Sequence, residues 1–104
     1  MIALSESLAI YARPRGVGVS CLSPGPVKTN IAEQVQVFGP IGPVHTPPLP
    51  LLEPDEVAVQ VLDAIRKDTF LVPTHRAVYG ILVERAADPE GFLAGQVRAH
   101  TEAP

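Results

Sequence analysis

The sequence is poor in cysteine and in positive charge, and each shortage argues against a class of protein. The single cysteine, Cys21, rules out an internal disulfide, so we expect a cytoplasmic protein in which it is a small buried apolar side chain. Eight Lys and Arg residues among 104, without a basic stripe, argue against nucleic acid and anionic membrane surfaces as partners. No apolar run approaches the length of a transmembrane helix. We expect no metal, because the histidines are too far apart in sequence for a local metal motif: His45, His75 and His100.

Apolar residues and proline are what the sequence does contain. A hydrophobic fraction of 46% over 104 residues is enough for one domain with a small core. Seven of the twelve prolines lie in residues 24–52, which predicts one long irregular connection, because proline interrupts helices and central strands. This connection is too apolar for a solvated linker. We therefore expect it to pack over another part of the protein, with a short helix at residues 30–37.

Regular elements are predicted on both sides of the connection. Before it, leucines at helical spacing predict a helix over residues 2–12, and an apolar run predicts a strand over residues 17–22 that is covered on both faces. After it, a helix is predicted over residues 53–67. A proline and acidic residues stand at the start of this segment and basic residues stand at its end. The other expected elements are a strand at residues 70–72 and helices at residues 77–87 and 90–99.

The order of these elements predicts an α/β fold with parallel strands. Two parallel strands do not make a self-sufficient sheet, so the strand at residues 17–22 requires neighbours that these 104 residues do not supply. Met1 lies where a helix is already under way, and we expect the chain to begin inside a structural element. The pattern therefore predicts part of a larger α/β domain.

A motif follows the first predicted strand. The segment Ser23-Pro-Gly-Pro-Val-Lys-Thr-Asn30 resembles the Pro-Gly-x-Val-x-Thr motif after the sixth strand of the short-chain dehydrogenase/reductase family. Three further pieces stand in that family's order. Residues 4–19 resemble the stretch after its catalytic Tyr-x-x-x-Lys, Glu53-Pro-Asp-Glu-Val-Ala58 resembles its next helix, and residues 70–74 resemble its seventh strand. The resemblance covers residues 2–75, and the order and spacing of the four pieces make it specific.

The resemblance implies the C-terminal part of a Rossmann-like, doubly wound parallel sheet that is incomplete on its own. It divides the chain into four parts: helix, strand and cofactor-side turn (1–29), a substrate-lid-like loop (30–52), a helix and strand (53–74), and C-terminal helices with a tail (75–104). It also implies hydride transfer between NAD or NADP and an alcohol or carbonyl substrate, in which the cofactor carries the chemistry. The residues that distinguish NAD from NADP would lie outside these four parts.

The catalytic residues of the family are absent from this sequence. It contains neither a Gly-rich dinucleotide turn nor a Tyr-x-x-x-Lys. Tyr11 is no substitute, because Arg15 stands where the Lys would be. We therefore assign no catalytic residue and expect the chain alone to be inactive.

By resemblance, the cofactor-binding residues are Pro24, Gly25, Val27 and Thr29. Gly25 would let the backbone approach the cofactor closely. The backbone of Val27 would meet the nicotinamide carboxamide, and Thr29 would bond the carboxamide or a phosphate. The apolar loop that follows would be the substrate lid, through Ile31, Val35 and Phe38. The residues themselves leave two plainer roles open: Pro24-Gly25 as a structural turn, and Thr29 or Asn30 as the N-cap of a short helix.

Two other functional hypotheses stay open. A non-enzymatic interaction module derived from the same family would self-associate through the apolar faces of residues 2–12 and 92–97. In the family the helix that corresponds to residues 2–12 commonly packs across a dimer interface, so a homo-oligomer is expected in either case. The third hypothesis is a start assigned within a longer coding sequence, which would leave a chain without independent function.

Overall fold

The computed structural model describes residues 1–40 and 48–102. In this part of the chain the fold is mixed α/β, with four α-helices and a two-stranded parallel sheet. The elements follow in the order α1 (Ile2–Ala12), η1 (Arg13–Arg15), β1 (Cys21–Ser23), η2 (Ile31–Gln34), α2 (Pro54–Arg66), β2 (Leu71–Pro73), α3 (Arg76–Ala87) and α4 (Pro89–Glu102). None of the helices in the described residues is long and apolar enough to cross a membrane.

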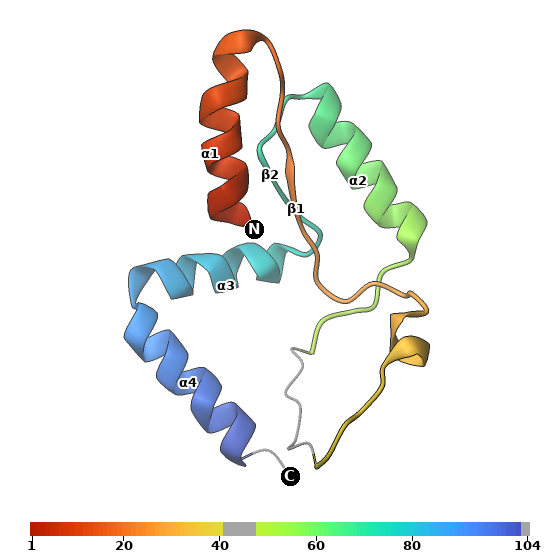
Figure 1. Ribbon diagram of the computed structural model, residues 1–104, viewed down its shortest axis with the longest axis vertical. Coiled ribbons are helices and arrows are strands. Elements are labelled where there is room, and N and C mark those ends of the chain that lie inside the picture. Colours follow the sequence, from red (N-terminus) through yellow and green to blue (C-terminus); the bar gives the residue numbers. More distant parts are fainter. Residues whose placement is uncertain (41–47, 103–104) are drawn as a thin grey trace.

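The two strands lie side by side, between α1 and α2 in the view of Figure 1. Their register pairs Cys21 with Leu71, Leu22 with Val72 and Ser23 with Pro73. The order helix, strand, long connection, helix, strand agrees with the α/β expectation, and α2 is the crossover helix that a parallel pair needs.

The first strand differs from the sequence prediction in position and in burial. It begins at Cys21 rather than at Val17, because the short β2 offers pairing only to Cys21–Ser23. The expectation that both faces are covered is wrong: Cys21 is buried, whereas Leu22 is 39% exposed. An apolar run shows that residues avoid water, but it does not show which partner is present to cover them.

The helices on either side of the sheet follow local sequence signals. Helix α1 has the predicted bounds, and it ends in the 3-10 turn η1 and at Gly16, whose φ of 77° a glycine adopts without strain. Helix α2 has Pro54 at its first position and Asp55 and Glu56 in its first turn, where acidic side chains favour the helix dipole. Both helices contribute small buried side chains to the core, including Ala9 of α1.

The C-terminal helices are separated at the Asp88-Pro89 step, as predicted. The Asp88 carboxylate accepts a hydrogen bond of 3.0 Å from the Gly91 backbone N–H, which is N-cap geometry for α4. Helix α4 begins at Pro89 and continues to Glu102, past the predicted end at residue 99. Helix α3 contacts both β2 and α4, so the last helix is attached to the sheet through α3.

The long connection leaves the end of the sheet where β1 finishes (Figure 1). Its predicted helix at residues 30–37 is the shorter 3-10 turn η2, Ile31–Gln34. The expectation that the connection packs over the protein is wrong for its described apolar residues, because Ile31, Val35 and Phe38 are 69%, 64% and 87% exposed. Ile41 and Val44, which belong to the same prediction, lie outside the described residues.

The molecule exposes more surface than a compact protein of its mass. Its accessible surface is 8095 Å², whereas the scaling law for compact monomers gives roughly 5,600 Å² for 11.0 kDa. Its radius of gyration is 16.6 Å, against about 13 Å for a compact domain of 100 residues. The core consists of small or partly covered side chains, and no large side chain in the described residues is fully buried.

Candidate functional site

The candidate site lies where the two parallel strands end together. Because Ser23 pairs with Pro73, the residues that follow β1 and β2 emerge at the same edge of the sheet. Pro24-Gly25 follows β1, and Thr74-His75 follows β2. Open α/β sheets bind their ligands outside the carboxyl ends of the strands, so this edge is the candidate ligand site.

Thr74 connects both strands and α2 at this edge. Its backbone N–H donates to the Ser23 carbonyl at 3.3 Å, and its own carbonyl accepts from the Gln60 side-chain amide at 3.3 Å. Its hydroxyl oxygen accepts from the Gly25 backbone N–H at 2.7 Å and lies 2.9 Å from His75 Nδ1. Thr74 is 8% exposed, so these bonds are shielded from water.

His75 joins Thr74 to the returning end of the long connection. Its Nε2 lies 2.6 Å from the carbonyl oxygen of Pro50, and the residue as a whole is 8% exposed. A carbonyl can only accept, so Nε2 carries the proton in this contact. In the neutral ring Nδ1 is then an acceptor, and the Thr74 hydroxyl donates to it.

The His75 ring occupies the space that a side chain at residue 25 would need. A Cβ built on Gly25 would lie 2.8 Å from His75 Cε1 and 3.2 Å from Cγ, and closer still to Nδ1. The backbone of Gly25 does not have a positive φ, so its conformation does not by itself require glycine. Glycine at residue 25 allows the close approach of His75. The approach of a cofactor to Gly25, which the resemblance implied, stays a prediction.

Val27 is fixed by a short parallel bridge to Leu52. The Lys28 N–H donates to the Leu52 carbonyl at 2.8 Å, and the Leu52 N–H donates to the Pro26 carbonyl at 3.1 Å. In a parallel bridge of this form, the N–H and C=O of the central residue point away from its partner. The backbone edge of Val27 therefore faces away from Leu52, just beyond the end of β1.

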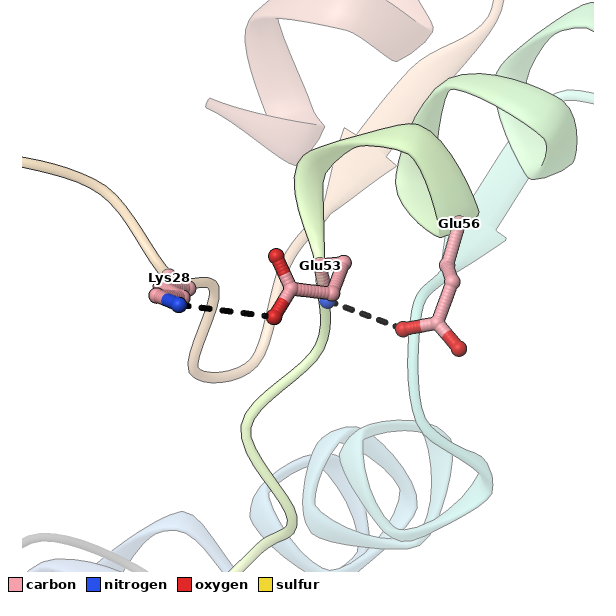
Figure 2. Close-up of polar contacts among 3 residues, drawn as sticks. All are labelled: Lys28, Glu53 and Glu56. Atoms are coloured by element: carbon pink, nitrogen blue, oxygen red, sulfur yellow. Dashed lines mark hydrogen bonds and ion pairs between the residues drawn. The ribbon is translucent and has the colours of Figure 1, made fainter.

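Two acidic residues, Glu53 and Glu56, lie where the long connection ends and α2 begins. Figure 2 shows Lys28 and Glu56 on opposite sides of Glu53. The Glu56 carboxylate accepts from the Glu53 backbone N–H at 2.8 Å, which caps the first turn of α2. Lys28 Nζ lies 3.8 Å from Glu53 Oε1, and both side chains are more than half exposed. The backbone bridge, rather than this ion pair, therefore closes the base of the connection.

The structure brings together some of the predicted site residues and separates others. Gly25 and Val27 lie at the sheet edge, and Pro24 forms the exposed start of the turn. Thr29 is exposed, and its hydroxyl accepts a long bond of 3.4 Å from the Ile31 N–H at the start of η2, which is close to the capping role left open above. The lid residues do not reach this edge as a packed group: Ile31, Val35 and Phe38 are all exposed.

Sequence reasoning missed Thr74, His75 and Pro50. A usable signal was present, because both predicted strands end in a turn containing proline and a small or polar residue, and parallel strands finish at a common edge. The described residues contain no group of three His, Cys, Asp or Glu side chains that could hold a metal ion. The polar groups of the site are thus a hydroxyl, an imidazole and backbone amides.

A hollow at the opposite end of the strands is separate from this site. It has a volume of about 750 Å³ and is lined in part by Arg13, Ser20, Ile65 and Asp68. It opens beside the start of β1, where Ser20 donates to the Thr69 carbonyl at 2.7 Å. It lies away from the carboxyl ends of the strands.

Comparisons with known proteins add no family to this picture. No protein-family model, no curated protein and no solved structure matches the chain. The functional argument therefore rests on the geometry of the strand ends and on the motif at residues 23–30.

Proposed function

We propose that this chain forms the nicotinamide side of the cofactor site in a NAD(P)-dependent short-chain oxidoreductase that acts on an alcohol or carbonyl substrate. It would be the C-terminal part of that enzyme's Rossmann-like sheet. The observation that carries the proposal is the backbone edge of Val27, which faces away from Leu52 just beyond the carboxyl end of β1. Such edges are where doubly wound sheets bind dinucleotides.

The groups at this edge suit a nicotinamide carboxamide. A carboxamide has one acceptor oxygen and two donor hydrogens, and the N–H and C=O of a single residue complement both. The Thr29 hydroxyl, two residues further on and exposed, can add a bond to the carboxamide or a phosphate. The bound dinucleotide would supply hydride transfer, while Val27 and Thr29 would orient the nicotinamide ring.

The same proposal requires that the 104 residues do not turn over substrate. They contain no Tyr-x-x-x-Lys to transfer the proton. We expect no alcohol-dependent production of NADH or NADPH by the purified chain. Measurable production above a blank, abolished by heating the protein, would contradict this assignment.

A ligand comparison tests the proposed site directly. In ¹⁵N-labelled protein, nicotinamide mononucleotide should shift the amide signals of Val27 and Lys28, whereas ADP-ribose should leave them in place. This outcome is expected because the adenosine side of the family's cofactor site would lie outside this chain. If both ligands shift the same amides, or if neither does at millimolar concentration, the proposal fails.

A matched pair of variants separates the site from general effects. Thr29→Val removes one hydroxyl at the site, and Thr101→Val makes the same change in exposed helix α4. Loss of one hydrogen bond should weaken nicotinamide mononucleotide binding roughly two- to tenfold in the first variant and leave it unchanged in the second. A thermal melt with NADH or NADPH then identifies the preferred dinucleotide, because a ligand of the native state raises the midpoint.

One observation favours a second candidate, a non-enzymatic interaction module. The surface of the chain exceeds that of a compact monomer by roughly 2,500 Å², an area comparable with a stable protein interface. Helix α1 exposes Leu4, Ile10 and Tyr11 at 70%, 77% and 62%. Concentration-dependent self-association, lost in Ile10→Asn but kept in the α3 control Val83→Asn, together with no response to dinucleotide, would favour this candidate.

A further inference from the structure

The side chains of Thr74 and His75 support the bridge that orients Val27. They do so at the residues that precede each bridge partner by two positions. Gly25 stands two residues before Val27, and Pro50 stands two residues before Leu52, its partner. At that level the two backbone segments are not bonded to each other. Thr74 bonds the first through the Gly25 N–H, and His75 bonds the second through the Pro50 carbonyl.

The hydrogen bonds that join Gly25 to Pro50 through Thr74 and His75 all run in one direction from donor to acceptor. The Gly25 N–H donates to the Thr74 hydroxyl oxygen at 2.7 Å, and the Thr74 hydroxyl donates to His75 Nδ1 at 2.9 Å. His75 Nε2–H then donates to the Pro50 carbonyl at 2.6 Å. Each group acts in a role its chemistry allows, and the sequence of bonds requires the Nε2–H tautomer of the neutral ring.

Thr74 and His75 are buried and closely packed against the turn after β1. Thr74 and His75 are both 8% exposed, and the ring lies against the bare backbone of Gly25. The Thr74 backbone is held in turn by Ser23 of β1 and by Gln60 of α2. Movement of the ring would therefore disturb the turn, the returning stem and the strand end together.

From this geometry we infer that Thr74 and His75 are positioning residues for the Val27 backbone edge, an inference that rests on the proposed nicotinamide site. They set the distance between the turn after β1 and the stem before α2, and thereby the direction in which the N–H and C=O of Val27 point. Neither side chain contacts the ligand in this role.

The first test uses the unaltered chain and needs no ligand. Long-range ¹H–¹⁵N correlation spectra distinguish the two tautomers of a histidine ring by the nitrogen that carries the proton. His75 should be the Nε2–H tautomer when neutral. A neutral ring with its proton on Nδ1 would overturn the inference, because Nε2 would then face the Pro50 carbonyl with a lone pair.

The second test measures amide hydrogen exchange in three variants. In Thr74→Val, the Gly25 and Lys28 amides should exchange roughly tenfold faster, as expected for loss of one hydrogen bond. The Cys21 amide, which donates to the Phe70 carbonyl at 2.6 Å, should be unchanged. Thr74→Ser should restore the slow rates, and His75→Ala should accelerate Lys28 and Leu52. Equal acceleration at Cys21 would indicate general loss of stability and overturn the positioning role.

The third test connects the residues to the ligand. Nicotinamide mononucleotide should bind His75→Ala and Thr74→Val at least several-fold more weakly than the unaltered chain, and Thr74→Ser with unaltered affinity. If the unaltered chain does not bind it, the proposed function fails, while the tautomer and exchange results still decide whether the two residues position Val27. If binding is intact and equal in all variants, only the positioning role is overturned.

Discussion

Replacing Gly25 by alanine should test the central contact of the site. The added methyl group would come within 2.8 Å of His75 Cε1 and nearer still to Nδ1. The ring has little freedom to retreat, because one nitrogen bonds Thr74, the other bonds the Pro50 carbonyl, and the residue is 8% exposed. The substitution must therefore displace the turn or break at least one of these bonds.

The expected cost follows from these two effects. Overpacking a close contact costs about 1–3 kcal/mol, and loss of a hydrogen bond adds about 0.5–1.5 kcal/mol. In a His75→Ala background the space is empty, so Gly25→Ala should then cost less than about 1 kcal/mol. The difference between the two backgrounds predicts a coupling energy of about 0.5–4.5 kcal/mol between residues 25 and 75.

Urea unfolding of four proteins, followed by far-ultraviolet circular dichroism, measures this coupling. The four are the unaltered chain, Gly25→Ala, His75→Ala and the double variant. Gly80→Ala is the matched control, because its added methyl meets no atom within 4 Å in helix α3 and should raise stability by up to about 1 kcal/mol. An equal cost of Gly25→Ala in both backgrounds would refute the packing of His75 against the turn.

Further predictions concern the ends of the helices and the stem of the connection. Glu56→Ala should lower the free energy of unfolding by about 0.5–1 kcal/mol, because it removes the acceptor of the Glu53 N–H; Glu56→Gln, which keeps an acceptor, is the control in the same urea series. Lys28→Ala should change stability by less than about 0.5 kcal/mol, since its 3.8 Å ion pair is exposed, and a larger loss would show that the ion pair closes the base of the connection. Asp88→Ala should cost about 1 kcal/mol and speed hydrogen exchange at Gly91, and unchanged exchange there would contradict the N-cap.

The helices were predictable because their signals are local. The helix from Ile2 to Ala12 was identified from its apolar spacing and from Pro14 and Gly16, which follow it. The start of α2 was identified from Pro54 and the acidic residues of its first turn. The break at Asp88-Pro89 was equally clear, because proline cannot continue a helix. The structure adds that Asp88 caps the next helix. These features do not depend on which other segment lies nearby.

The strands and the long connection were less predictable. The first strand was expected from residue 17, but pairing with the short β2 restricts it to Cys21–Ser23. Apolar residues such as Phe38 led to the expectation of a packed lid, whereas in the structure Phe38 is 87% exposed. Hydrophobicity indicates a preference for burial, and only the presence of a partner surface can satisfy it.

The sequence by itself determined the α/β order, the bounds of α1, the start of α2 and the position of the turn after the first strand. The tertiary structure decided what that turn contacts. The bond from Gly25 to Thr74 joins residues 49 positions apart, and the bond from His75 to Pro50 joins residues 25 positions apart. Such contacts depend on strand register and on the crossover through α2, which no local pattern encodes. For that reason the sequence located the glycine, and only the fold showed that His75 lies against it.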